Sequence, residues 1–145
     1  MDVVIGSDHA GYKLKSEIIK YFTSQNININ FIDVGTYSEN SVDYPDIAHK
    51  AIGLINEGKC KNGVLICKSG VGMSIVANRY KNIRCALCWN EEIAKLSRMH
   101  NDANVIALPA HFIDIETAIK CINAFLNTPF EGGRHLRRIS KIEIV

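Results

Sequence analysis

The sequence predicts an α/β fold of three layers, in which a five-stranded parallel sheet lies between two layers of helices. Short β-branched runs alternate with longer amphipathic stretches along the chain, as in strands joined by helical crossovers. Each strand candidate is nearly all apolar, as expected for a strand that is covered on both faces. Length and uniform composition predict one domain over residues 1–145.

The expected elements follow in order along the chain. Strands are predicted at 3–6, 29–34, 64–67, 85–88 and 105–108. Apolar residues at helical spacing predict helices around 14–22, 47–55, 93–99 and 115–125, with a shorter helix after Gly72. Right-handed crossovers then predict the strand order 2-1-3-4-5. Ligands bind such sheets at the carboxyl ends of the strands where the order reverses, here between strands one and three.

Charge and hydropathy exclude several classes of partner. The net charge of +2 is too small to indicate a nucleic-acid partner. No apolar run approaches the 18 residues typical of a membrane span, so no membrane partner is expected. Only Met1 and Asp2 precede the first apolar run, too few for a signal peptide, and we expect a cytoplasmic protein.

The five cysteines are odd in number and irregularly spaced, which favours reduced thiols over a disulfide framework. Cys85 and Cys88 form a C-x-x-C pair, but a strand points them to opposite faces of the sheet. No second pair or histidine cluster completes a zinc site, so no metal is expected and both are interpreted as core residues.

The exits of strands one and three carry the densest polar and glycine chemistry of the chain. Asp8 and His9 follow the first strand, where a carboxylate could orient a sugar hydroxyl and an imidazole could donate to a phosphate. Asp8 could equally cap the next helix. The segment 67–74 reads as a strand end, a glycine loop and a helix start, which is typical of an anion site or simply of a tight turn.

Cys67 ends the third strand just before a helix start, where the local field favours a thiolate. A thiol with a pKa of about 8.5 is about 3 per cent ionised at pH 7, a deficit of about 2 kcal/mol. A helix N-terminus contributes up to about 2 kcal/mol in partly buried sites. Location therefore favours function for Cys67, whereas an inert buried thiol is favoured for Cys60, Cys85 and Cys121.

Basic side chains gather late in the chain. A helix over 134–138 would aim Arg134 and Arg138 at one spot, which suits a phosphate, although a solvated basic face is the usual explanation of such a run. His100 closes the fourth predicted helix, where it could donate a proton or only cap the helix end.

Five motifs in order, GSDHAGYKLK, DYPDIA, VLICKSGVGMSIVANR, LSRMHNDANVIAL and FEGGRHLRRI, resemble the ribose-5-phosphate isomerase B family over nearly the whole chain. The resemblance implies a Rossmann-like (flavodoxin-like) homodimer, or a tetramer, that interconverts D-ribose 5-phosphate and D-ribulose 5-phosphate through a cis-enediol. It implies no cofactor and no metal. A six-carbon substrate such as allose 6-phosphate or galactose 6-phosphate is the alternative.

The resemblance also implies roles for individual residues. Cys67 matches the base that moves the proton between C2 and C1, and His100 matches the acid that helps to open the ring. The residues that match substrate-binding positions are Asp8, His9, Tyr44, Lys68, Ser69, Gly70, Val71, Gly72, Asn101, Arg134 and Arg138. Because an oxyanion must be stabilised as it forms, the backbone N–H groups from Gly70 to Ser74 are expected to contribute.

Three positions depart from the family's usual pattern. Lys68 stands where glycine is common and would bring a cation close to the thiol. His111 stands where arginine is common and would make phosphate binding weaker and pH-dependent. Ser69 replaces a common threonine and keeps the hydroxyl.

Chain direction predicts how the site is assembled. The helix before strand five must return to the amino edge of the sheet, so His100 should lie far from Cys67 of its own chain. We expect a two-fold dimer that brings His100 and Asn101 of one subunit to Cys67 of the other.

Two other functions compete with isomerisation. A cysteine phosphatase needs an arginine six residues after the cysteine, and Met73 stands there. A phosphosugar-binding module would keep the glycine loop and the arginines, but would need neither Cys67 nor His100.

Overall fold

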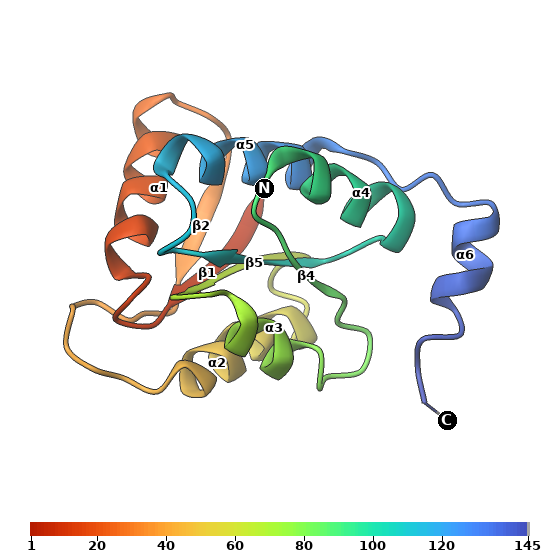
Figure 1. Ribbon diagram of the computed structural model, residues 1–145, viewed down its shortest axis with the longest axis horizontal. Coiled ribbons are helices and arrows are strands. Elements are labelled where there is room, and N and C mark those ends of the chain that lie inside the picture. The colour runs from red at the N-terminus through yellow and green to blue at the C-terminus, as the bar shows by residue number, and fades with distance from the viewer. Residues whose placement is uncertain (145) are drawn as a thin grey trace.

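The computed structural model describes residues 1–144, which form the three expected layers (Figure 1). The elements in chain order are β1 (Asp2–Ser7), α1 (Tyr12–Ser24), β2 (Asn30–Asp33), α2 (Tyr44–Asn56), β3 (Asn62–Cys67), α3 (Val71–Ala77), β4 (Cys85–Leu87), α4 (Glu91–Asn101), β5 (Val105–Pro109), α5 (Ile115–Asn127) and α6 (Arg134–Ile139). All five predicted strands are confirmed to within two residues at each end.

Local chemistry marks where the helices begin. Pro45 lies in the first turn of α2, as predicted. The side chain of Asn90 accepts a hydrogen bond from the Ile93 backbone N–H and caps α4. Asp114 caps α5 in the same way through the N–H of Thr117. The side chain of Thr117 and then this backbone N–H lower the pKa of Asp114.

The strand order is β2-β1-β3-β5-β4, with every pair parallel, so the predicted order 2-1-3-4-5 is wrong in its last two places. β5 pairs with β3 along five residues, whereas β4 pairs with β5 along only three. All five residues of β5 are buried, and the three of β4 are only partly buried. The longer strand therefore takes the inner place, where both of its faces are covered, and the short one forms the outer strand of the sheet.

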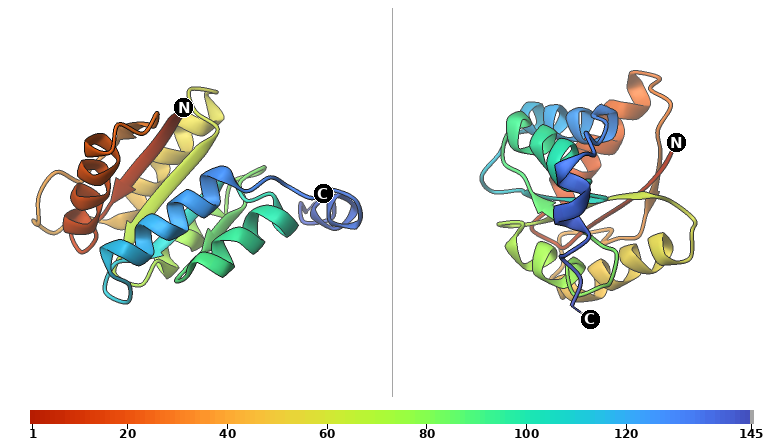
Figure 2. Two further views of the ribbon diagram at one scale, coloured as in Figure 1. Left: turned by 90° about the horizontal axis from the view of Figure 1, so that it is seen from above. Right: turned by 90° about the vertical axis from the view of Figure 1, so that its right-hand side faces the viewer.

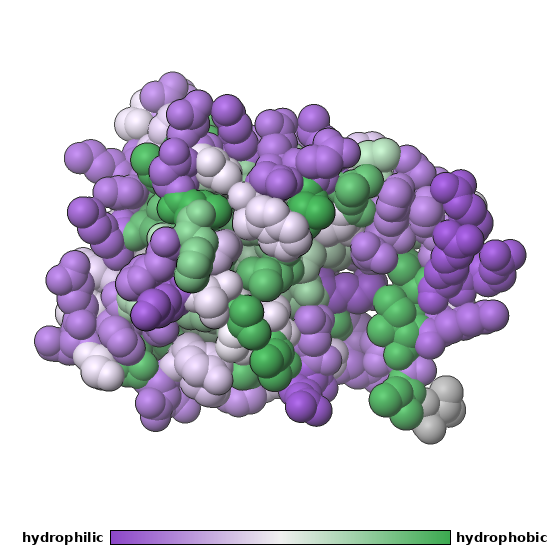
Figure 3. All heavy atoms as spheres, in the orientation of Figure 1, coloured by the Kyte–Doolittle hydropathy of each residue, from purple (hydrophilic) through white to green (hydrophobic). Residues whose placement is uncertain are grey.

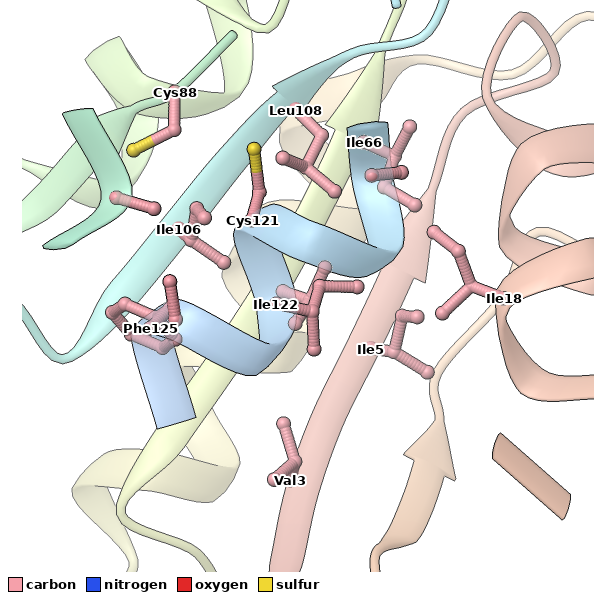
Figure 4. Packing of buried hydrophobic residues seen from close by; sticks show 14 of the residues in the cluster. Val3, Ile5, Ile18, Ile66, Cys88, Ile106, Leu108, Cys121, Ile122 and Phe125 are labelled. Atoms are coloured by element: carbon pink, nitrogen blue, oxygen red, sulfur yellow. The ribbon is translucent and has the colours of Figure 1, made fainter. Parts of the chain in front are cut away.

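The sheet lies between two layers of helices (Figures 1 and 2), and an apolar core fills the space on each of its faces. On one face of the sheet, α1, α4 and α5 cover the larger core, which includes Ile5, Ile106, Ile122 and Phe125 (Figure 4). On the other face, α2 and α3 cover a smaller core that contains Leu65 and the side chain of Cys67. Cys85 packs against the smaller core and Cys88 lies in the larger one, so the predicted opposite orientations are confirmed.

The C-terminal arm, residues 128–144, carries α6 away from the body of the molecule (Figures 1 and 2). An opening separates the arm from the body in Figure 3, and a cavity of about 710 Å³ lies there between residues 78–86 and the end of the arm. Leu136, Ile142 and Ile144 are exposed on the arm. Among the described residues, no helix has the length and apolar character that crossing a membrane requires.

Candidate active site

The carboxyl ends of β1 and β3 lie side by side, where the strand order reverses. Ser7 is paired with Ile66, and the backbone N–H of Asp8 donates to the Ile66 carbonyl at 3.1 Å. Gly11 closes the contact, since a Cβ there would lie 2.8 Å from the same carbonyl oxygen. The predicted reversal of strand order between strands one and three is therefore confirmed.

Asp8 and His9 are both engaged by backbone N–H groups. Asp8 is buried, and its Oδ1 accepts from the Gly11 N–H at 3.0 Å. This bond stabilises the turn before α1, whereas the N-cap residue of α1 is Gly11 and the helix has no side-chain cap. His9 Nδ1 accepts from the Val42 N–H at 3.2 Å. An imidazole that accepts through Nδ1 holds its proton on Nε2 when neutral, so His9 can donate to a ligand oxygen.

Cys67 lies at the end of β3 and is 5 % exposed. Its carbonyl accepts from the Ala110 N–H at 2.9 Å, which fixes the strand end against the exit of β5. Gly70, with φ of +74°, then turns the chain into α3. A Cβ at Gly70 would lie 2.5 Å from Leu87 Cδ1, so this position has neither the conformation nor the room for a side chain.

The loop after Cys67 offers free backbone donors. Ser69 Oγ accepts from the Val71 N–H at 3.3 Å, and the Gly70 carbonyl accepts from the Ser74 N–H at 3.1 Å. Among the described residues, no protein acceptor pairs with the N–H groups of Ser69, Gly70, Gly72 and Met73. Of the five backbone N–H groups expected to act as donors, from Gly70 to Ser74, three are therefore unpaired. The N–H of Ser69 is a fourth unpaired donor. Backbone N–H groups in this arrangement can bind an anionic oxygen.

Tyr44 and Lys68 flank this loop. The ring of Tyr44 packs on Gly72, where an added Cβ would lie 2.7 Å from Tyr44 Cζ. Lys68 is exposed, and its carbonyl accepts from the His111 N–H at 3.1 Å. Lys68 and His111, two of the three departures from the family pattern, are therefore neighbours. Met73, which stands where a phosphatase needs its arginine, is fully buried.

A second group of predicted site residues lies toward the amino ends of the strands, opposite the carboxyl ends that carry Cys67. It consists of His100, Asn101, Arg134 and Arg138. Asn101 lies at the end of α4. Its carbonyl accepts a hydrogen bond at 2.9 Å from Nε of Arg84, the residue just before β4. Gly63 of β3 pairs with Val105 of β5, and Cys67 pairs with Pro109. Four residues of strand, about 13 Å, therefore separate the amino ends of these strands from their carboxyl ends. The structure therefore does not bring His100 and Cys67 of one chain together.

His135, which was not among the predicted site residues, lies within this second group. His100 stacks on His135 with ring centroids 4.3 Å apart, which joins α4 to α6. Burial, then the charge of Arg134 and then that of His100 lower the pKa of His135. Glu131 lies four residues before His135, in the non-helical segment that precedes α6. This spacing of a carboxylate and a histidine could have indicated the pair in the sequence. Arg134 and Arg138 are exposed on α6.

The three cysteines expected to be inert, and Cys88, which was interpreted as a core residue, are poorly ionised thiols. Burial raises the pKa of Cys60, raises that of Cys88 to about 12 and raises that of Cys121 to about 11. Burial, followed by the neighbouring Cys88, also raises the pKa of Cys85. These thiols stay protonated at neutral pH, and none lies at the exits of β1 and β3.

Comparison with known proteins places this geometry in a family. The family model described as Ribose/Galactose Isomerase matches residues 3–142. The chain is 37 % identical to ribose-5-phosphate isomerase B of Escherichia coli over 143 residues, covering 99 % of this chain and 95 % of that protein.

Solved structures agree. A ribose 5-phosphate isomerase from Thermotoga maritima matches with a TM-score of 0.95 and 47 % identity, covering 99 % of this chain and 98 % of that one. Ribose-5-phosphate isomerase B from Mycoplasma genitalium, with ribulose-5-phosphate bound, matches with a TM-score of 0.89 and 38 % identity over 97 % and 93 % of the two chains.

Proposed function

Because this chain belongs to the ribose/galactose isomerase family and is a sugar-phosphate isomerase, we propose that its substrates are D-ribose 5-phosphate and D-ribulose 5-phosphate. The observation that carries the proposal is the meeting of Cys67, Asp8 and a loop of unpaired N–H groups at the ends of β1 and β3. The bound ribulose-5-phosphate in the Mycoplasma genitalium relative supports the five-carbon substrate.

Cys67 is the proposed base. Its thiolate takes the proton from C2 of the open-chain aldose while the carbonyl oxygen at C1 becomes an enediolate oxygen. A proton then passes from the C2 hydroxyl to the oxygen at C1, and the thiol returns its proton to C1, which leaves the carbonyl of the ketose at C2. The free N–H groups of the loop stabilise the enediolate oxygen as charge develops on it, since each well-placed donor contributes about 2.7–4 kcal/mol. Asp8 and His9 orient the sugar hydroxyls from the neighbouring strand exit.

His100 is the proposed acid for opening the furanose ring, and Arg134 and Arg138 bind the phosphate, with Asn101 beside them. Since about 13 Å of sheet separates the edges that carry His100 and Cys67, we propose that a second copy of the chain completes each site. The projecting arm supports this assembly, because α6 carries both arginines and exposes Leu136 to a partner (Figure 2).

We further propose that residues 1–145 form one isomerase domain that needs no cofactor for turnover. The five free thiols of the protein suit a reducing compartment, and we propose the cytoplasm as its location.

The first experiment measures ketose formation from ribose 5-phosphate and from allose 6-phosphate, with EDTA present, by the wild type and by Cys67→Ser. A positioned base contributes about 10²–10⁴-fold, so kcat should fall by that factor in Cys67→Ser. Cys60→Ser is the matched control, because Cys60 is 6 % exposed against 5 % for Cys67. Equal turnover by Cys67→Ser and Cys60→Ser would exclude the cysteine base, and a preference for allose 6-phosphate would exclude the five-carbon substrate.

The second experiment tests the shared site. Cys67→Ala and His100→Ala proteins are each expected to be inactive, and a mixed dimer would contain one site with both residues intact. Subunit exchange, confirmed by native mass spectrometry of isotopically labelled chains, should therefore restore activity. Exchanged mixtures that stay inactive would refute the shared site.

A further inference from the structure

Three potential metal ligands gather where α4, α6 and the segment before α6 meet. His100 lies in the last turn of α4, His135 lies in the first turn of α6, and Glu131 is held close by its N–H, which donates to the Met99 carbonyl at 3.1 Å. One ligand atom from each of His100, Glu131 and His135 lies within 4.8 Å of the other two. His100 is more than 30 residues away from Glu131 and His135 in sequence, so the fold itself brings it to the other two ligands.

The imidazole of His135 lacks the partner that a buried polar group normally has. His135 is 5 % exposed, and its Nε2 makes no hydrogen bond among the described residues. The Glu131 Oε2 atom lies 3.3 Å from this nitrogen, but not in the direction that a hydrogen bond requires. A buried nitrogen in this state calls for a further ligand, because an unsatisfied polar group costs about 1–3 kcal/mol.

We propose that His100, Glu131 and His135 bind one zinc-class transition-metal ion, with water as the fourth ligand. Two imidazoles and one carboxylate are a common zinc ligand set in proteins. Bonds of about 2.0–2.1 Å in a tetrahedron place ligand atoms about 3.3 Å apart, so closure from 4.8 Å needs a shift of about 1.5 Å at most. The ring planes, now 12° from parallel, must tilt apart, and His100 is only partly buried and can rotate.

Nearby charge opposes the ion but leaves the site intact. Arg134 and Arg138 lie on the same helix as His135 and repel a cation, whereas the Glu131 carboxylate attracts it. The site should therefore bind a transition metal, which forms strong bonds to imidazole, and discriminate against Mg²⁺ and Ca²⁺, which prefer oxygen ligands. If the proposed function holds, the ion also occupies the ring-opening acid His100, so metal inhibits the isomerase.

The test is titration of the metal-free full-length protein with Co²⁺, which reports four-coordinate binding by its visible d–d absorption. The wild type should bind one Co²⁺ per chain, and Zn²⁺ should displace it while excess Mg²⁺ does not. Glu131→Gln keeps the side-chain shape and should weaken binding about tenfold or more. Glu116→Gln is the matched control, since Glu116 is an exposed glutamate with an i, i+4 partner on α5, and it should bind as the wild type does.

His135→Asn should abolish the signal, and its fold is checked by circular dichroism. Glu131→Gln keeps the proposal falsifiable should His135→Asn not fold, because Glu131 is largely exposed. Absence of visible absorption, or equal affinity in Glu131→Gln and the wild type, would overturn the metal site. Thiolate-to-cobalt charge-transfer bands would overturn it as well, because they would assign the ion to cysteine. Since the readout is spectroscopic, the metal site and the isomerase proposal can fail separately.

Discussion

Substitution of Gly70 by alanine tests how closely the loop after Cys67 packs on the sheet. Gly70 has φ of +74°, and alanine in this left-handed region costs about 1–2 kcal/mol. The added Cβ would also lie 2.5 Å from Leu87 Cδ1 and 3.2 Å from the carbonyl carbon of Leu108. Overpacking of this kind costs about 1–3 kcal/mol. The free energy of unfolding should therefore fall by about 2–5 kcal/mol in Gly70→Ala.

Gly58→Ala separates the two contributions. Gly58 has φ of +76°, nearly that of Gly70, but no atom lies within 4 Å of the Cβ that alanine would add. The free energy of unfolding of Gly58→Ala should therefore fall by the backbone contribution alone, about 1–2 kcal/mol. Urea unfolding followed by circular dichroism measures both variants, with the slope m compared to confirm two-state behaviour.

Isomerase activity supplies the second readout. The clash at Gly70 must displace the loop that carries the free N–H groups, so kcat/KM should fall in the folded Gly70→Ala protein and stay unchanged in Gly58→Ala. Equal losses of stability in the two variants, or full activity in Gly70→Ala, would show that the loop does not approach β5 as closely as the structure has it.

Further predictions concern buried polar groups, helix caps and thiols. Lys15→Met should lower the free energy of unfolding by about 3 kcal/mol, measured by urea unfolding, because Lys15 is 1 % exposed and donates to the partly buried Asp33 at 2.6 Å; no loss would contradict this ion pair. Asn90→Ala should lose about 1 kcal/mol with the cap of α4, measured the same way. With pKa values of about 12 and about 11, Cys88 and Cys121 should resist iodoacetamide in the native protein until the pH rises toward those values, as peptide mass spectrometry can follow; labelling at pH 7 would contradict their burial.

Much of the fold could be predicted from local patterns. The apolar strands and the helices between them depend on side-chain periodicity, which short segments carry by themselves. The meeting of Asp8 and Cys67 at one edge was also predictable, because parallel strands end on the same side. The opposite orientations of Cys85 and Cys88 were predictable as well, because successive side chains of a strand alternate between the two faces of the sheet.

The strand order could not be predicted in full. β4 and β5 both read as apolar strands, and only their competition for the place beside β3 decides which one is inside. The buried five-residue ladder of β5 wins over three half-buried residues of β4. This outcome depends on pairing between distant segments, which no local pattern encodes.

Residue types and their spacing along the chain account for the kinds of chemistry this protein carries: a thiol and a glycine loop at one strand exit, an aspartate and a histidine at its neighbour, and an arginine helix near the end. The side-chain contacts between distant segments depend on tertiary packing instead. This packing stacks His100 on His135 beside Glu131 and places β5, not β4, next to β3. Such contacts join residues far apart in sequence when helices and strands pack together, so no short segment encodes them.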